Sequence, residues 1–423
     1  MRASARLLFV LGLSLAGPNG AAAQNRPAFE AELAQLRTQL GISSMSAAVV
    51  ESGTLVWVRH FGISATPRDT VHYPIASLTK PMTAVLAMRL VERTRLSLEA
   101  PVDEAGPGVQ VRHLLSHTAA GDPGARFLYS SELFDRLAAP LERAAGTTLR
   151  AALAAEVFGP AGLRQTSAAR DVTPSAGIVS TVEDVARFVA TLERGDLLAG
   201  ASAATMFRPP RDAAGRGFPY ALGWFVQTVG GEQVRWHFGQ QGDASALLVT
   251  VPRRRRAFVL LARTDRLSAP FWLQLGDVRW SPAAVAFLTT WARMRLDLSA
   301  ARRTMLGALA AFGAGDRKKA VADARRALVL GPALGNMGDP AMLAAFARSG
   351  DHQLREAGRR VAQRLLAADA NHPRTLLDVA VLERQDGHPD EAGRLLQKIL
   401  ADRLATPEIA GTARELLAEV RDL

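Results

Sequence analysis

The placement of the strand-like segments most constrains how this chain of 423 residues can fold. Two short β-prone runs, residues 45–50 and 55–58, flank a turn-like segment near the beginning of the chain. Two more pairs of such runs lie within residues 224–262, after a long stretch whose apolar residues recur at helical spacing. Isolated strands leave backbone hydrogen-bonding groups unpaired, so strands from both sides of the helical stretch are expected to share one sheet.

This arrangement predicts an α+β fold, in which an antiparallel sheet flanked by helices carries an inserted all-helical subdomain at about residues 84–215. Residues 24–300 would form this domain, and the junction of sheet and subdomain is the expected site. Four consecutive arginines at 253–256 lie between two strand-like runs. We expect them to form a solvated hairpin tip and not a phosphate or membrane patch.

Residues 301–423 are rich in alanine, leucine and arginine, and predict an all-helical C-terminal region. Two segments of this region match each other at an offset of 72 residues, with the paired positions Gly315 and Gly387, Ala320 and Ala392, and Leu328 and Leu400. The offset is about twice the ~34-residue period of tetratricopeptide repeats. A tetratricopeptide-like region that recruits a protein partner and a plain helical bundle both fit this pattern.

The first 23 residues have the features of a signal peptide. Arg2 and Arg6 precede an apolar stretch at residues 7–16, and alanines at 21–23 supply small residues for cleavage. The apolar stretch is shorter than the ~20 residues that a membrane-spanning helix needs. We therefore expect an exported protein, periplasmic or secreted, without stable membrane insertion.

Composition narrows the classes of partner. The net charge is +11, but the basic residues are scattered and aromatic residues make up only 6% of the chain, which argues against nucleic acid. The chain has no cysteine, so it has neither disulfides nor a lipoprotein attachment site. No spacing of Asp, Glu and His suggests a metal site, and we expect no cofactor.

Lysine is the rarest basic residue here. Of 51 basic residues only four are lysine, and Lys80 is the single one in the first 317 residues. Arginine stays protonated at any working pH, whereas burial can make a lysine release its proton. Lys80 is therefore a candidate general base.

Lys80 belongs to a Ser-x-x-Lys motif, Ser77-Leu78-Thr79-Lys80, ahead of an apolar helical pattern. Pro81 is tolerated only in the first turn of a helix, so the helix should begin near Ser77. Residues three apart share one face of a helix, which would bring the lysine amine beside the serine hydroxyl. A nucleophile next to its base is what covalent catalysis requires.

Two further motifs follow in order, Tyr129-Ser130-Ser131 and His237-Phe238-Gly239. With residues 113–118 (His-Leu-Leu-Ser-His-Thr), they make residues 24–298 resemble the superfamily of class C β-lactamases, penicillin-binding proteins, esterases and D-alanyl-D-alanine peptidases. The resemblance implies the same sheet with an inserted subdomain.

The resemblance also implies roles for individual residues. Ser77 would attack a carbonyl carbon, and Lys80 with Tyr129 would move the protons. The backbone amides of Ser77 and Gln240 would hold the oxyanion. His237 and Gly239 would line the substrate-binding strand, and histidine at position 237, where β-lactamases carry lysine, resembles the esterases and peptidases. His113 and His117 are interpreted as structural.

Ser131 stands where the family usually carries a substrate-binding asparagine, and a hydroxyl offers fewer donors at shorter reach. The leading hypothesis is an exported serine hydrolase that acts on an ester, an amide or a cell-wall peptide. The alternative is a catalytically impaired sensor or scaffold, related to penicillin-binding proteins, that signals through the helical tail.

Overall fold

The structure is a computed structural model that describes residues 19–62, 71–264, 267, 277–296, 300–313, 315–330, 343, 346–368, 370–402, 405 and 407–421. The predicted leader lies outside the described residues, except for residues 19–23 at the start of helix α1 (Asn19–Gln39). Among the helices described, none is both long enough and apolar enough to cross a lipid bilayer.

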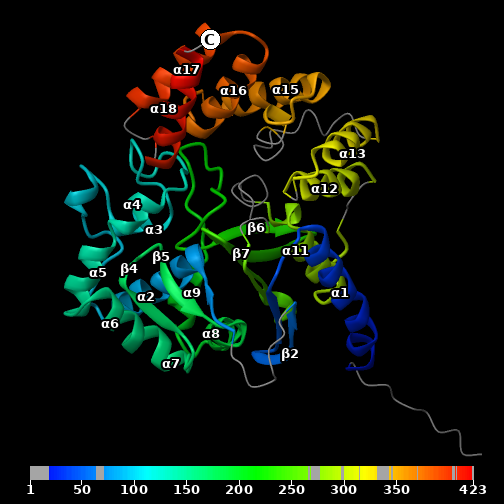
Figure 1. Cartoon of the computed structure of the whole chain (residues 1–423). Coiled ribbons are helices and arrows are strands. Elements are labelled where there is room, and N and C mark those ends of the chain that lie inside the picture. Colours follow the sequence, from blue (N-terminus) through cyan, green and yellow to red (C-terminus); the bar gives the residue numbers. More distant parts are fainter. Residues whose placement is uncertain are drawn as a thin grey trace, which may run out of the picture.

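An antiparallel sheet lies at the centre of the molecule (Figure 1). Strands from the two sides of the insert meet where β1 pairs with β9 along its whole length. In spatial order, the strands described in this sheet are β2 (Thr54–Phe61), β1 (Met45–Glu51), β9 (Arg256–Ala262), β8 (Ala244–Val251), β7 (Glu232–Gln241) and β6 (Phe225–Val229). The expected hairpins and their union in one sheet are confirmed.

Helices cover both faces of this sheet. Small side chains such as Ala48 and Ala246 face α2 (Thr79–Glu92) and α8 (Val182–Arg194), while Trp236 and Phe258 lie on the opposite face. That opposite face is covered by α1, α11 (Pro282–Thr290) and α12 (Ala300–Gly313). Burial on both sides explains why β8 and β9 are nearly continuous apolar runs in the sequence.

The insert is not purely helical, which corrects one detail of the prediction. A small second sheet has the order β3 (Tyr73–Pro74), β5 (Ala176–Ser180), β4 (Ser167–Thr173). Strand β4 is largely exposed and its pairing shifts register after Ala168, so no alternating apolar pattern marks it. The other described segments of the insert are α3 (Val111–Leu115), α4 (Ser131–Asp135), α5 (Ala138–Ala145), α6 (Leu149–Leu153), α7 (Gly159–Ala161), α9 (Gly200–Met206) and short turns at Asp103–Ala105 and Ala154–Phe158.

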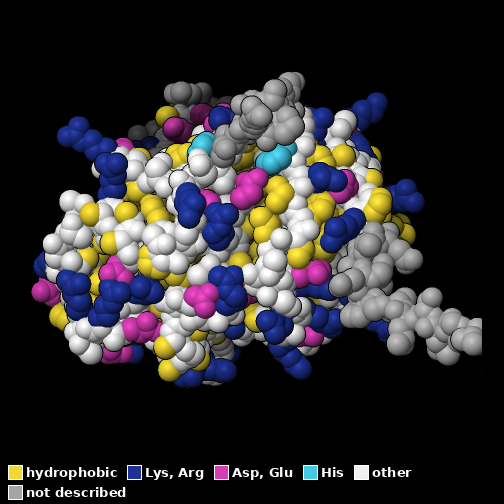
Figure 2. Space-filling view, turned by 90° about the horizontal axis from the view of Figure 1, so that it is seen from below, with side chains coloured by type: hydrophobic (Ala, Val, Ile, Leu, Met, Phe, Trp, Pro, Cys, Tyr) yellow, Lys and Arg dark blue, Asp and Glu magenta, His cyan; other side chains and the backbone are white. Residues whose placement is uncertain are grey.

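Arg253, Arg254 and Arg255 form the exposed tip of the β8–β9 hairpin, as predicted, and Arg256 is the first residue of β9. Arg254 forms an ion pair with Glu232 at 3.0 Å, and Arg256 forms one with Glu51 at 3.3 Å. On the face shown in Figure 2, basic and acidic side chains are interspersed. The positive net charge is therefore not gathered into one patch on that face.

The described residues from 300 onward are mainly helical, as predicted, and their helices form an arc across the top of the view in Figure 1. After α12 the described helices are α13 (Arg317–Leu330), α15 (His352–Ala368), α16 (Pro373–Gln385), α17 (Pro389–Ala401) and α18 (Pro407–Arg421). Gly315 and Gly387 occupy equivalent turns with φ of +78° and +81°, and Ala320 and Ala392 are both fully buried. The internal match thus corresponds to two similar helix pairs, while the assignment to tetratricopeptide repeats stays a prediction.

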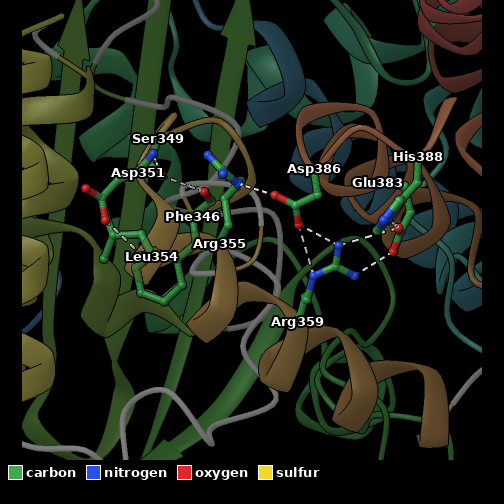
Figure 3. Close-up of polar contacts among 9 residues, drawn as sticks. All are labelled: Phe346, Ser349, Asp351, Leu354, Arg355, Arg359, Glu383, Asp386 and His388. Carbon is green, nitrogen blue, oxygen red and sulfur yellow. Dashed lines mark hydrogen bonds and ion pairs between the residues drawn. The ribbon is translucent and has the colours of Figure 1, made fainter.

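An ionic network fixes α15 to the turn between α16 and α17 (Figure 3). Arg359 bonds to Glu383 and Asp386, and Arg355 donates to Asp386 at 2.6 Å. His388 completes the network through Glu383 at 2.8 Å. All of these groups except His388 are partly buried, so the network has a structural role in joining consecutive helices of the tail.

The apolar core continues across the expected domain boundary at residue 300. Met305 and Leu309 of α12 belong to the same buried cluster as Phe29, Trp57 and Trp291, on the outer face of the sheet. The division at residue 300 stays a prediction, but α12 packs as part of the sheet domain.

We therefore expect Leu309→Ala to destabilise the sheet domain by about 2–5 kcal/mol, because it leaves a cavity in a shared core. All six tryptophans precede residue 292, so urea unfolding followed by tryptophan fluorescence reports on the sheet domain and not on the tail. Val329→Ala, at a side chain that is 80% exposed, is the matched control and should change little. An unchanged fluorescence midpoint for Leu309→Ala would mean that the tail folds independently.

Candidate active site

Ser77 lies in the single turn η1 (Ala76–Leu78) that leads directly into α2. The predicted helix start near Ser77 is confirmed, since α2 begins at Thr79 and Pro81 stands in its first turn. Ala76 has a φ of +47°, in the left-handed region that side chains rarely adopt. This local strain is stored next to the predicted nucleophile, which is where such strain commonly occurs.

Strand β7 holds this strained turn in place. A Cβ atom on Gly239 would lie 2.3 Å from the Ile75 carbonyl oxygen and 3.2 Å from the Ser77 amide nitrogen. On the other side, the Ile75 amide donates to the Ile178 carbonyl of the small sheet at 3.0 Å. Only glycine lets β7 pass so close to the nucleophile's backbone.

Lys80 is completely buried beside Ser77. Its ammonium group donates to Ser77 Oγ at 2.9 Å and to Ser131 Oγ at 3.0 Å. The nitrogen also lies over the rings of Tyr129 and Phe134, at 4.9 and 5.6 Å from their centroids. In the part of the chain that is described, no carboxylate forms an ion pair with it. The predicted contact between nucleophile and base is thus present.

This environment changes the chemistry of the amine. Burial lowers the pKa of Lys80 to about 7, and the more distant carboxylate of Asp135 only partly opposes the effect. A large fraction of the amine is therefore neutral near neutral pH and has a lone pair free to accept a proton. An arginine at this position would have no such state.

Tyr129 approaches Ser77 and Lys80 from the loop before α4. Its ring packs against His117, Phe225 and Phe238, with centroids 4.3, 5.9 and 5.8 Å away. Burial raises the pKa of the phenol, and the nearby Ser77 hydroxyl partly offsets this rise. Among the described residues, the phenol oxygen has no partner in hydrogen-bond geometry. Tyr129 is thus at the site, and its role in proton transfer stays a prediction.

His237 is fully buried and both of its ring nitrogens are occupied. Nε2 lies 2.7 Å from Tyr220 Oη, and Nδ1 lies 2.7 Å from the Phe238 carbonyl oxygen. A carbonyl can only accept, so Nδ1 carries the proton and Nε2 accepts from Tyr220. Burial and the charge of Lys80 hold the pKa of His237 well below its usual range. Its predicted contact with substrate stays untested, and this geometry favours a positioning role.

The structural interpretation of the two loop histidines fits their contacts. His113 Nδ1 accepts the Gln110 amide at 3.1 Å, and His117 Nδ1 accepts the Ser130 amide at 3.2 Å. Burial holds the pKa of His117 well below its usual range. The His117 ring therefore braces the segment that carries Tyr129, and the His113 ring caps the start of α3.

Ser131 is the most exposed member of the predicted set, and Gln240 is half-buried like Ser77. Ser131 is exposed at the first position of α4, which is capped by Ser130 Oγ accepting the Leu133 amide at 3.2 Å. Gln240 is half-buried in β7, beyond Trp236, the last residue of β7 that pairs with β6. Gly239, directly before Gln240, packs against the Ser77 backbone, and the oxyanion role of the Ser77 and Gln240 amides stays a prediction.

Sequence reasoning missed three side chains that shape this site. Phe134 covers the Lys80 nitrogen, Tyr220 orients His237, and Asp135 acts on Lys80 at longer range. Phe134 and Asp135 closely follow the motif Tyr129-Ser130-Ser131. Their closeness to that motif in the sequence could have marked them as candidate site residues. Among the described residues, no group of three or more His, Asp and Glu side chains is placed to hold a metal ion.

A sequence model of one protein family, Beta-lactamase, matches residues 29–271, more than half of the chain. The chain belongs to the beta-lactamase family. This confirms the resemblance that the three motifs suggested, and makes the protein a hydrolase of that family. The helical tail lies outside the matched residues.

Individual relatives agree with this assignment. Esterase EstB of Burkholderia gladioli is 30% identical over 23% of this chain, and the match spans only 38% of the esterase's own length. The octameric penicillin-binding protein homologue from Pyrococcus abyssi is similar in structure, with a TM-score of 0.56 and 18% identity, over 66% of this chain and 81% of that one. A D-stereospecific amidohydrolase from Streptomyces sp. has a TM-score of 0.50 and 17% identity, over 65% and 99%. The two structures support the beta-lactamase fold alone.

We expect Gly239→Ala to reduce activity at least tenfold, because the added methyl group would displace the turn that carries Ser77. Gly200→Ala is the matched control, since a Cβ there meets nothing within 4 Å. Steady-state hydrolysis of an activated ester measures the effect, and circular dichroism checks the fold. Full activity in a folded Gly239→Ala variant would contradict the close approach of β7.

The pH dependence should follow Lys80. When the pH falls below the Lys80 pKa of about 7, the amine is protonated and cannot act as a base. We therefore expect kcat/KM to fall roughly tenfold for each pH unit below 7 and to level off above it. Lys80→Arg should be inactive at every pH, whereas Lys398→Arg, at an exposed lysine of α17, should match the wild type. An active Lys80→Arg variant would show that Lys80 supports hydrolysis through its positive charge and not as a base.

Proposed function

We propose that this protein is an exported serine acyl hydrolase that forms an acyl-enzyme at Ser77 and hydrolyses an ester, an amide or a cell-wall peptide. The observation that carries the proposal is the buried Lys80 amine, hydrogen-bonded to Ser77 at 2.9 Å and free of any carboxylate ion pair among the described residues. Such an amine can take the serine proton as the hydroxyl attacks.

The remaining steps follow from the surrounding groups. The attack places negative charge on the carbonyl oxygen, and the amides of Ser77 and Gln240 would stabilise that charge. The leaving group departs with a proton, and water then attacks the acyl-enzyme with Lys80 again as the base. Release of the acyl group returns the proton to Ser77.

The substrate class is supported by two features. Neutral, buried His237 provides no cation where the β-lactamases of the superfamily carry lysine, which favours uncharged esters and amides over anionic antibiotics. The curated relative is named an esterase and one structural relative an amidohydrolase. Export to the periplasm or beyond rests on the leader-like residues 1–23 alone.

The impaired-sensor alternative depended on Ser131 replacing asparagine. In the structure Ser131 bonds to Lys80, so the substitution keeps a polar contact to the base. We therefore favour the enzyme, and the tail is left as a candidate surface for a protein partner.

Ser77→Ala should abolish hydrolysis of a short-chain activated ester, because it removes the nucleophile and little packing. Labelling of the wild-type protein by a fluorophosphonate, read by intact-mass spectrometry, should add one adduct that Ser77→Ala lacks. Ser167→Ala, at an exposed serine of β4, is the control and should behave like the wild type. Undiminished turnover by Ser77→Ala would refute the proposed function.

A further inference from the structure

We propose that Ser131 is a second proton carrier of this site, which passes a proton between Lys80 and the leaving group of the substrate. The proposal rests on the proposed acyl transfer at Ser77 and adds a residue to it. It assigns Ser131 a role in the chemical step that goes beyond holding a substrate.

The first support is the geometry around the lysine. Lys80 is fully buried and has two hydroxyl partners at nearly equal distances, Ser77 Oγ at 2.9 Å and Ser131 Oγ at 3.0 Å. Ser131 is exposed, whereas Ser77 is half-buried. Ser131 therefore connects the buried amine to the open side of the site, where a leaving group has to depart.

The second support is that Tyr129, His237 and His117 form no hydrogen bond with the Lys80 amine. Lys80 faces the ring of Tyr129 at 4.9 Å from its centroid, and the phenol oxygen, which lies near the Ser77 hydroxyl, forms no hydrogen bond with the amine. His237 uses both nitrogens on Tyr220 and its own strand. His117 uses Nδ1 to accept the Ser130 amide. Within the described part of the site, only serine hydroxyls are hydrogen-bonded to the amine.

The third support is the chemistry of a hydroxyl. A serine hydroxyl accepts one proton while it donates another, so a proton can pass through it without a charged intermediate. An asparagine amide offers donors and an acceptor on different atoms and is far less suited to such exchange. Serine at position 131 thus allows a relay that the usual asparagine does not.

The proposed step balances as follows. In acylation, Ser77 Oγ bonds to the carbonyl carbon and its proton moves to the neutral Lys80 amine. As the bond from that carbon to the leaving oxygen or nitrogen breaks, Ser131 gives its hydroxyl proton to the leaving atom and takes a proton from the Lys80 ammonium. In deacylation the direction reverses: water loses a proton to Ser131, Ser131 passes one to Lys80, and Lys80 returns one to Ser77.

The test compares leaving groups. Two esters of one acyl group are used, a nitrophenyl ester whose leaving group needs no proton and an ethyl ester whose leaving group does. For Ser131→Ala we expect a loss of kcat/KM of at least ~100-fold on the ethyl ester and under ~10-fold on the nitrophenyl ester, since general acid catalysis typically contributes 10²- to 10⁴-fold. The rate of fluorophosphonate labelling at Ser77 should stay within about threefold of the wild type, because fluoride departs without a proton.

Ser131→Thr keeps the hydroxyl and should recover most activity on the ethyl ester, whereas Ser131→Asn should not. Equal losses on both esters would overturn the relay and make Ser131 a residue that only positions Lys80. Wild-type activity of Ser131→Asn on the ethyl ester would also overturn it, in favour of a binding role. Failure of the proposed function itself is distinguishable, because the wild-type protein would then not label at Ser77.

Discussion

The site depends on burying the Lys80 amine without a counter-charge. An ammonium removed from water is costly, and here the surroundings are two hydroxyls and two aromatic faces in place of a carboxylate. These groups tolerate the charged form but do not strongly favour it over the neutral amine. A carboxylate in contact would raise the pKa of the lysine and remove its basicity. Burial of the Lys80 amine thus serves reactivity at the expense of stability.

The central sheet makes this burial possible. Strand β7 brings Gly239 against the turn before Ser77, and the insert brings Tyr129 and Phe134 over the lysine. Neither β7 nor the insert could form the site alone, because each supplies only one of its walls. The pairing of β1 with β9 joins the strands from the two sides of the insert into one sheet.

The tail is joined to this framework more closely than its composition suggests. Met305 and Leu309 share a core with Phe29 and Trp291, so the first tail helix is part of the outer layer of the sheet. The helices farther along are held to one another by ion pairs such as those of Arg359. Buried apolar clusters also join these distant helices, one around Leu376 and Leu396 and one around Val361 and Leu382, so apolar and ionic contacts occur together along the tail.

The sequence alone determined the elements whose signals are local. The Ser77–Lys80 spacing with Pro81, the three hairpins, the arginine-rich tip and the helical tail all follow from patterns within about twenty residues. Only the tertiary structure decided the contacts between distant segments: the bond from Lys80 to Ser131, the occupied nitrogens of His237 and the small sheet that includes β4. The reason is physical. Burial, pKa and hydrogen-bond partners belong to a side chain's three-dimensional surroundings, and in one sequence those surroundings come from segments far apart along the chain.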